Sequence, residues 1–162
     1  VLPDLHAIIK SIIFPDAVAD KQRFNLTEDD YLFLRKYMSM LPRESNIPVY
    51  SSIRDHYVKF IYYGAENGIA DPEIRIFNKP GDAYGFLLDA AYFADYKNNI
   101  EFIVSGVIYC NSDGIFNDNK YDYDKLGFPF FKNLGKVLYE YELKRTRKDI
   151  TDLSAYRLQY ND

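Results

Sequence analysis

The chain has 162 residues and is 48% hydrophobic, so it is long enough for one domain with a hydrophobic core and too short for two domains of ordinary size. A formal net charge of -4 gives no basic field for phosphates, which argues against nucleic acids and anionic membranes as partners. One cysteine, Cys110, excludes an internal disulfide, and with two histidines it cannot build an ordinary structural zinc site.

No apolar run approaches the roughly 20 residues that a membrane-spanning helix needs. The first residues also lack an initiator methionine and the basic region of a signal peptide. We therefore expect a mature or truncated piece of a longer protein, with no membrane span in this chain.

The first predicted element is a short buried helix over residues 5–13, where apolar residues recur at helical spacing. The pattern stops at Pro15, because a proline disfavours helical geometry in the residue before it. Residues 16–24 are polar and mixed, which is typical of a loop.

Two further helices are predicted. Thr27, with an acid three residues later, resembles a capping box and begins a helix that reaches Leu41. Residues 42–50 contain two prolines and indicate a surface connection. Residues 52–63 carry apolar side chains on one helical face and are followed by Gly64, a plausible C-cap, so we expect a third helix there and a loop over 64–72.

From Glu73 the apolar period changes to two. The alternation continues to Asp95 across an interruption at Asn78-Lys79-Pro80-Gly81, where we expect the strand to bend. Residues 96–99 have turn composition, and residues 100–110 form an apolar, β-branched run. The sequence thus predicts an α+β fold with an antiparallel sheet of at least three strands and packed helices.

Residues 111–126 are rich in Asp and Asn, but the spacing lacks the order and the closing Glu of an EF-hand loop, so a solvated loop is favoured over a calcium site. Tyr121 and Tyr123 in this loop can stack on sugars or line the edge of the core. The last helix is predicted over 128–144, with Pro129 in its first turn, and residues 146–162 read as a polar tail with a few anchoring Tyr and Leu.

The other reactive side chains are predicted to have structural positions and no catalytic role. His6 and His56 lie on predicted helices without a neighbouring acid or serine pattern, which indicates packing or surface positions. Cys110 ends an apolar strand and reads as a small buried hydrophobe. On local sequence alone, Lys79 fits an exposed bulge.

The order of these elements resembles a known family. Helices, then a strand with a Lys-x-Gly triplet, then two antiparallel strands and a long amphipathic helix resemble the C-terminal part of the serine β-lactamase and penicillin-binding protein superfamily. The segments "IRIFNKPGDAYGFLLDAAYFAD", "IEFIVSGVIYCNSDGIFND" and "YDYDKLGFPFFKNLGKVLYEYELKR" look like the β-lactamase-related serine hydrolases found as lipoproteins in Bacteroidetes. The likeness runs from about Leu5 to Arg145.

This resemblance implies a site along the Lys-x-Gly strand. Lys79 would be the cationic residue bordering the cleft, where it favours anionic substrate groups and developing negative charge. Gly81 would let a substrate backbone lie close to the strand, with Pro80 beside it. The backbone N–H of Asp82 would form one half of an oxyanion hole.

The chain departs from the family pattern in two respects. Pro80 stands where the family has Ser or Thr, so the hydroxyl that contacts a substrate carboxylate is missing. No serine in the chain is followed by a lysine three positions later, so the Ser-x-x-Lys nucleophile is absent. Tyr96-Lys97-Asn98 matches Tyr-x-Asn in letters, but it follows the Lys-x-Gly strand, whereas the family places that element before it.

We therefore expect residues 1–145 to be the C-terminal portion of a β-lactamase-like domain, with helices over 1–64 and the sheet and final helix over 73–145. Residues 146–162 would form the tail. The intact protein would transfer acyl groups from an amide or ester, without a cofactor or metal, on a peptide-like or cell-wall small molecule. The resemblance also implies an extracytoplasmic location, a lipid anchor upstream, and N-terminal strands missing here. The apolar surface left by those strands would be covered by a second copy in a homo-oligomer, by a rearranged tail, or by separately supplied N-terminal residues.

Two other functions stay open. One is a degenerate, non-catalytic module that binds peptide or glycan on the same fold. The other is a structural or interaction domain that uses a tyrosine-rich face, since the chain holds 16 tyrosines and 12 phenylalanines and no tryptophan.

Overall fold

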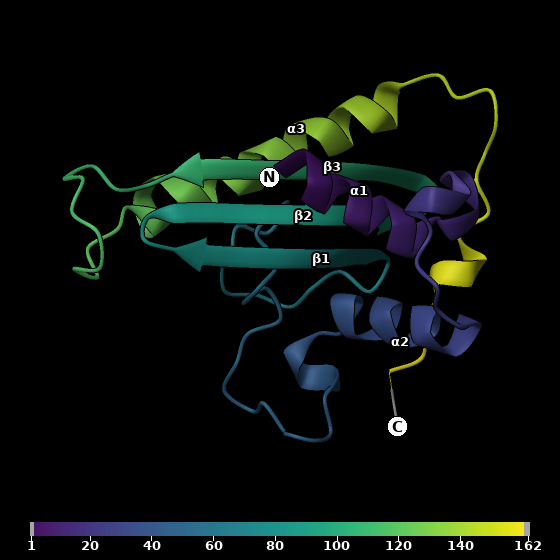
Figure 1. The fold of residues 1–162 in the computed structure, drawn as a ribbon, viewed down its shortest axis with the longest axis horizontal. Coiled ribbons are helices and arrows are strands. Elements are labelled where there is room, and N and C mark those ends of the chain that lie inside the picture. Colours follow the sequence, from purple (N-terminus) through teal and green to yellow (C-terminus); the bar gives the residue numbers. More distant parts are fainter. Residues whose placement is uncertain (1, 161–162) are drawn as a thin grey trace.

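Three antiparallel strands form the centre of the computed structural model, which describes residues 2–160 (Figure 1). They are β1 (Ile74–Ala83), β2 (Phe86–Asp95) and β3 (Ile100–Tyr109), paired in the order β1-β2-β3. The α+β class and the three-stranded antiparallel sheet are confirmed. Among the described residues β3 pairs only with β2, so both outer strands have a free edge.

Tight turns fix the register of the sheet. Tyr84 and Gly85 join β1 to β2, both with positive φ (51° and 88°), as a two-residue hairpin turn requires. Residues 96–99 join β2 to β3, and Asn99 has the left-handed conformation (φ 52°) that asparagine tolerates. The predicted turn at 96–99 is confirmed.

The expected interruption of β1 is wrong. The strand continues through Lys79-Pro80-Gly81, and Pro80 pairs with Asp89 in register. Proline is tolerated in this position because β1 is an edge strand and the proline nitrogen faces away from β2.

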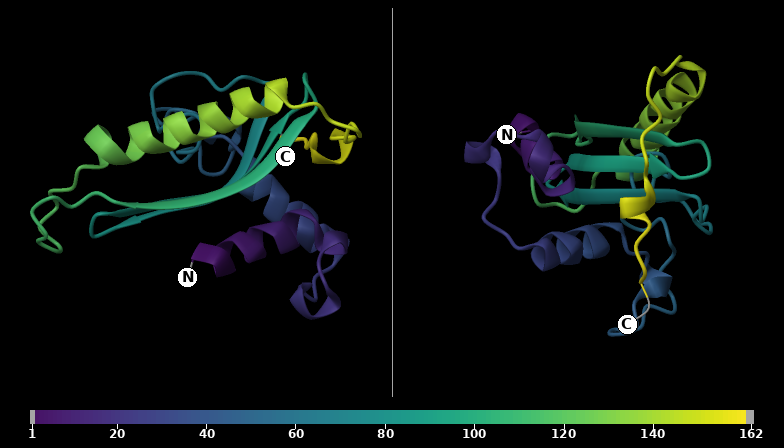
Figure 2. Two further views of the ribbon diagram at one scale, coloured as in Figure 1. Left: turned by 90° about the horizontal axis from the view of Figure 1, so that it is seen from above. Right: turned by 90° about the vertical axis from the view of Figure 1, so that its right-hand side faces the viewer.

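Helices cover both faces of the sheet, as the side view in Figure 2 shows. α3 (Phe128–Lys144) lies along one face, where Phe131 packs in a core with Leu87, Ala91 and Phe93. α1 (Leu2–Ile13) lies on the other face against β2 and β3, where Ile9 and Ile13 belong to a second core with Phe77, Ala90 and Tyr92. The predicted helices over 5–13 and 128–144 are confirmed, with α1 starting three residues earlier.

α2 (Glu28–Ser39) contacts β1 and begins at a capping box. The Thr27 hydroxyl accepts a hydrogen bond from the Asp30 N–H at 3.2 Å, and the Asp30 carboxylate accepts one from the Thr27 N–H at 2.9 Å. Thr27 is therefore the N-cap that the sequence predicts. Short 3₁₀ or π turns complete the chain at Pro15–Ala17, Asp20–Gln22, Pro42–Glu44, Tyr123–Gly127 and Ser154–Tyr156.

The predicted third helix over 52–63 is wrong, because this segment forms a series of turns. Its backbone N–H groups find tertiary acceptors instead of helical carbonyls. Those of Phe60 and Ile61 donate to the Asp89 carboxylate at 3.2 and 3.0 Å, and that of Tyr62 donates to the carbonyl of Phe131 in α3 at 3.2 Å. Tyr62 has a φ of 77°, which a helix cannot contain.

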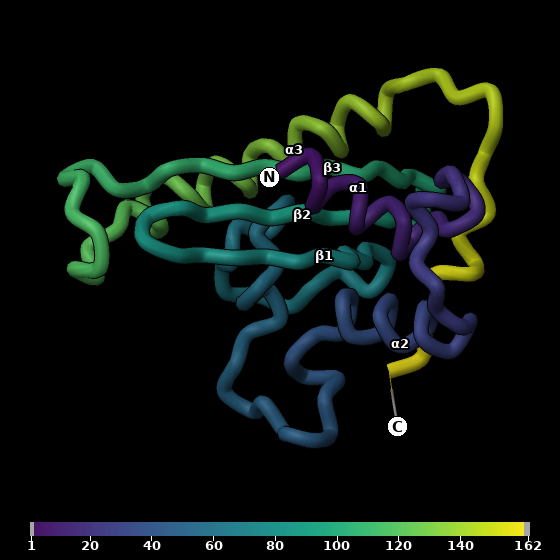
Figure 3. Tube along the Cα trace, viewed as in Figure 1, coloured from purple at the N-terminus to yellow at the C-terminus, as the bar shows by residue number. Residues whose placement is uncertain are grey.

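The C-terminal segment runs from the end of α3 past the β2–β3 turn and then toward α2 (Figure 3). Its anchoring residues are buried, as predicted: Leu153 joins the α1 core, and the Tyr160 hydroxyl lies 2.8 Å from the Ser39 hydroxyl. Tyr160 also stacks under the guanidinium of Arg75, 4.4 Å from the ring centre. No helix in residues 2–160 is both long and apolar enough to cross a membrane.

Candidate functional site

The four residues expected to form a site lie consecutively on the edge strand β1. Lys79 is exposed, and its Nζ donates a hydrogen bond to the neighbouring Pro80 carbonyl at 2.8 Å. A Cβ on Gly81 would meet Leu88 at 3.4 Å, an ordinary contact. Packing within this chain therefore does not require glycine at position 81.

The register shows which backbone groups of β1 face its free edge. Because a two-residue turn makes Ala83 and Phe86 a hydrogen-bonded pair, Asp82 belongs to the alternate set, whose N–H and C=O groups point away from β2. Ile76 belongs to the same set, and its carbonyl does point outward, accepting from Lys59 Nζ at 2.9 Å. The N–H of Asp82 thus faces the open edge, as an oxyanion donor would need to.

The side chains of Lys79 and Asp82 leave β1 on opposite faces. Lys79 pairs with Ala90, which belongs to the core under α1. Asp82 pairs with Leu87, which belongs to the core under α3. The structure therefore places the two residues side by side along the strand without bringing their side chains together.

A buried polar network anchors β1 beside Lys79. Asn78 donates through Nδ2 to the Asp89 carboxylate and to the Val58 carbonyl, each at 2.8 Å, and its Oδ1 accepts from Lys59 Nζ at 2.8 Å. Lys59 Nζ also donates to the Met38 carbonyl at 2.8 Å. All three side chains are less than 5% exposed.

Burial dominates the electrostatics of this network. Desolvation lowers the pKa of Lys59 to about 7, although the Asp89 charge opposes the shift. Desolvation likewise raises the pKa of Asp89 to about 6 against the hydrogen bonds of the Ile61 N–H and Asn78. Near neutral pH, the charged and neutral forms of each side chain are therefore close in free energy.

Sequence reasoning missed this network. Its visible signal was Asp89, a single acid inside the apolar run from Phe86 to Phe93, because an isolated buried carboxylate must find partners. Lys59 could not be assigned, since its hydrogen-bond acceptors lie on α2 and β1, which only the fold brings together. Every polar group of the network is hydrogen-bonded and enclosed, so its role is to position β1.

The two histidines occupy structural positions, as expected. His6 Nδ1 lies 2.9 Å from the Ser105 hydroxyl and links α1 to β3. The His56 ring is buried and stacked on Tyr63 with 3.9 Å between ring centres, and burial lowers its pKa. Cys110 is 1% exposed, which confirms the buried position predicted for it.

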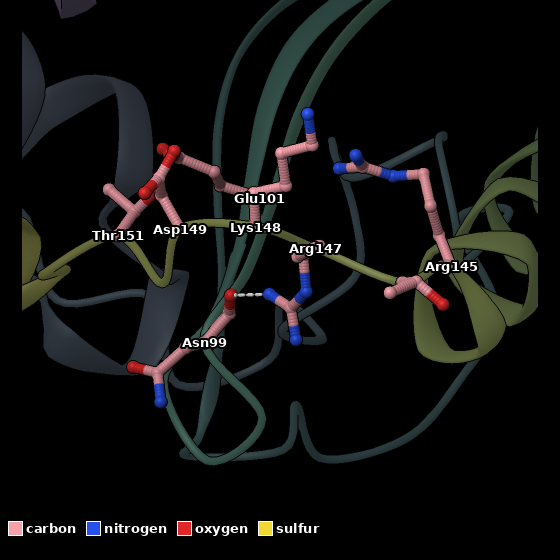
Figure 4. Close-up of a pocket in the computed structure, with 8 residues that line it drawn as sticks. Asn99, Glu101, Arg145, Arg147, Lys148, Asp149 and Thr151 are labelled. Carbon is pink, nitrogen blue, oxygen red and sulfur yellow. Dashed lines mark hydrogen bonds between the residues drawn. The ribbon is translucent and has the colours of Figure 1, made fainter.

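A polar cleft of about 500 Å³ lies between the C-terminal end of α3 and the β2–β3 turn (Figure 4). Figure 4 shows the Arg147 guanidinium directed at the Asn99 carbonyl, to which it donates, and Arg147 also donates to the Asn98 carbonyl at 3.0 Å. Arg145 is held by Glu142 at 2.6 Å. These arginines tie the segment after α3 to the sheet, and none of the expected site residues lies in the cleft.

Within residues 2–160, no group of three or more His, Cys, Asp or Glu is arranged to hold a metal ion. A scan against protein-family models and searches of curated proteins and of solved structures find no match to this chain.

Proposed function

We propose that this chain forms the C-terminal portion of a β-lactamase-like serine hydrolase and that β1 supplies one wall of its acyl-transfer site. The observation that carries the proposal is the continuous edge strand on which Lys79, Pro80, Gly81 and Asp82 follow one another, with the Asp82 N–H directed to the free edge. The order of helices, Lys-x-Gly strand, two antiparallel strands and long final helix supports it.

In the intact protein, a serine outside this chain attacks the carbonyl carbon of an amide or ester and gives up its proton to a base. The carbonyl electron pair moves to oxygen, and the Asp82 N–H donates to that oxyanion. The leaving amine or alcohol departs with a proton, and water then hydrolyses the acyl-serine. No serine here has lysine three positions on, so the chain alone has no acyl-enzyme chemistry.

Lys79 acts in this scheme as a fixed positive charge at the cleft rim. Its ammonium attracts anionic groups of a peptide-like or cell-wall substrate, while Pro80 offers no hydroxyl to a substrate carboxylate. The proposal places the protein in the periplasm or cell envelope, with a lipid anchor upstream of this chain.

The test uses the longer protein, incubated with a fluorophosphonate and with labelled penicillin, and followed by intact mass. We expect one covalent adduct on a serine encoded upstream in a Ser-x-x-Lys sequence, and none after that serine is changed to alanine. The 162-residue chain should stay unlabelled. A folded longer protein that takes up neither probe, or an upstream domain without Ser-x-x-Lys, would refute the proposal.

The second candidate is a non-catalytic module that binds peptide on the same fold. The free edge of β1 favours it, because outward N–H and C=O groups can accept an added strand. A complete upstream domain without a nucleophile, together with saturable peptide binding lost when β1 is altered, would favour this module.

A further inference from the structure

A groove opens at the tip of the β1–β2 hairpin, on the side away from Lys79. Its volume is about 580 Å³, within the range of about 300–1,000 Å³ that is usual for ligand sites. It is lined by Asp82, Ala83 and Tyr84 from the hairpin and by Asn117, Asn119, Tyr121, Tyr123, Asp124 and Phe128 from the segment that leads into α3. Figure 3 shows that segment extending past the hairpin turn.

The aromatic walls of the groove are held in place by their own hydroxyls. Tyr123 accepts a hydrogen bond from the Gly85 N–H at 2.9 Å, and Tyr121 accepts one from the Asn117 N–H at 2.9 Å. The two rings are 5.3 Å apart between centres. Tyr84, at the hairpin turn, is 53% exposed. The rings of Tyr121 and Tyr123 are thus held in place before any ligand arrives, which lowers the entropic cost of binding.

The polar side chains of the groove are free to bind. Among residues 2–160, no hydrogen bond is made by the side-chain amides of Asn117 and Asn119 or by the carboxylates of Asp82 and Asp124. The amides offer donors and acceptors, and the carboxylates offer acceptors. Both asparagines have left-handed backbones (φ 64° and 61°).

This combination selects among ligand classes. No lysine or arginine lines the groove, so the two carboxylates repel anions. An amine would use the carboxylates and leave the amide donors unused. A neutral sugar uses every group, because each hydroxyl both donates and accepts and the apolar face of the ring packs on an aromatic side chain.

We propose that the groove between the β1–β2 turn and residues 117–128 binds a neutral oligosaccharide, with Tyr84 and Tyr121 as packing surfaces and Asn117, Asn119, Asp82 and Asp124 as hydrogen-bonding groups. The site does not rest on the acyl-transfer proposal, since it uses the carboxylate of Asp82 and not its backbone N–H, and it does not involve Lys79.

The test is titration of the 162-residue chain with chitotetraose, cellotetraose and maltotetraose, followed by NMR shifts and calorimetry. We expect one of these neutral probes to saturate and to shift the amides of residues 82–85 and 117–124. Tyr84→Asn should weaken it about tenfold, because it removes a packing surface while asparagine before glycine suits the turn. The double change Asn117→Gly with Asn119→Gly should weaken it at least as much, since glycine keeps the left-handed backbone without the amides.

Tyr141→Asn is the matched control, because it removes an exposed ring near the other end of α3 and should leave the affinity unchanged. Thermal melting of each variant confirms that it is folded. The proposal is wrong if none of the three neutral probes saturates, or if Tyr141→Asn weakens binding as much as Tyr84→Asn. Binding of a de-N-acetylated, cationic chitotetraose alone would instead identify an amine site and would also overturn it.

Discussion

The side-chain amide of Asn78 donates to the Asp89 carboxylate at 2.8 Å, inside the sheet and one residue before Lys79. Lys59 completes the connection from outside the sheet by donating to the Asn78 carbonyl oxygen at 2.8 Å. Lys79, the exposed residue expected in the site, is thus the next residue along β1 after Asn78, whose side chain is held by three hydrogen bonds.

Asp89→Ala should destabilise the fold by about 3 kcal/mol, because the N–H groups of Phe60 and Ile61 lose their acceptor and the buried Lys59 loses the negative charge near it. Urea unfolding followed by circular dichroism measures the change. Asp82→Ala, which removes an exposed carboxylate of the same sheet, should cost less than about 0.5 kcal/mol. Equal losses in the two variants would contradict the role given to the network.

The same pair predicts a minimum in stability between about pH 6 and pH 7. The raised pKa of Asp89 means that the folded state holds its proton longer than the unfolded state, so stability falls as pH rises toward about 6. The lowered pKa of Lys59 means that the folded state releases its proton first, so stability rises again above about 7. Unfolding free energies across pH 4–10 should show this minimum in the wild type. The double variant Lys59→Met with Asp89→Asn should lack it, and a minimum of the same depth in the double variant would exclude this pair as the cause.

Thr27→Ala should cost about 1 kcal/mol, because the N-terminal N–H groups of α2 lose the hydroxyl that caps them. Thr27→Ser keeps the hydroxyl and should stay within a few tenths of a kcal/mol of the wild type. The denaturant midpoints of the two variants distinguish them, provided that the unfolding free energy depends on denaturant concentration with the same slope in both. A serine variant as unstable as the alanine variant would show that the methyl group matters instead of the cap.

Gly135→Ala should destabilise the protein although alanine favours helices by about 1 kcal/mol. A Cβ at this position would lie 2.3 Å from the backbone nitrogen of Tyr62, where α3 meets the turns of residues 51–65. Overpacking of this kind costs about 1–3 kcal/mol and is borne here by backbone atoms that cannot rotate away. Glu140→Ala, on the exposed side of α3, is the control and should be nearly neutral. A stabilised Gly135→Ala would mean that the turns move aside freely.

Lys79→Ala should leave the unfolding free energy within about 0.5 kcal/mol of the wild type, because the side chain is exposed and bonds only its neighbour's carbonyl. In the longer protein it should slow covalent labelling by penicillin at least about tenfold, since the charge at the cleft rim is lost. Lys79→Met removes the charge and keeps a long side chain, so labelling of this variant should be equally slow. Unchanged labelling in both variants would remove Lys79 from the site.

Local sequence signals predicted most of the regular elements. The alternation around β2, the apolar run of β3 and the face of α3 each carry their period over ten or more residues, and Thr27 marks the start of α2. Lys79, Pro80, Gly81 and Asp82 could be named as site candidates because their order matches a family motif. The outward direction of the Asp82 N–H depends on a two-residue turn that the sequence pattern did not specify.

The sequence by itself determined the class of the fold, the strands and three of the helices, because periodicity and caps act between near neighbours. Only the tertiary structure decided that residues 52–63 form turns instead of a helix, that Asn78 links Lys59 to Asp89, and that β1 runs unbroken through Pro80. For residues 52–63 the partners lie far along the chain: the Asp89 carboxylate and the Phe131 carbonyl accept from the N–H groups of Phe60, Ile61 and Tyr62. A buried N–H must have an acceptor, and which acceptor is nearest is a property of the folded chain.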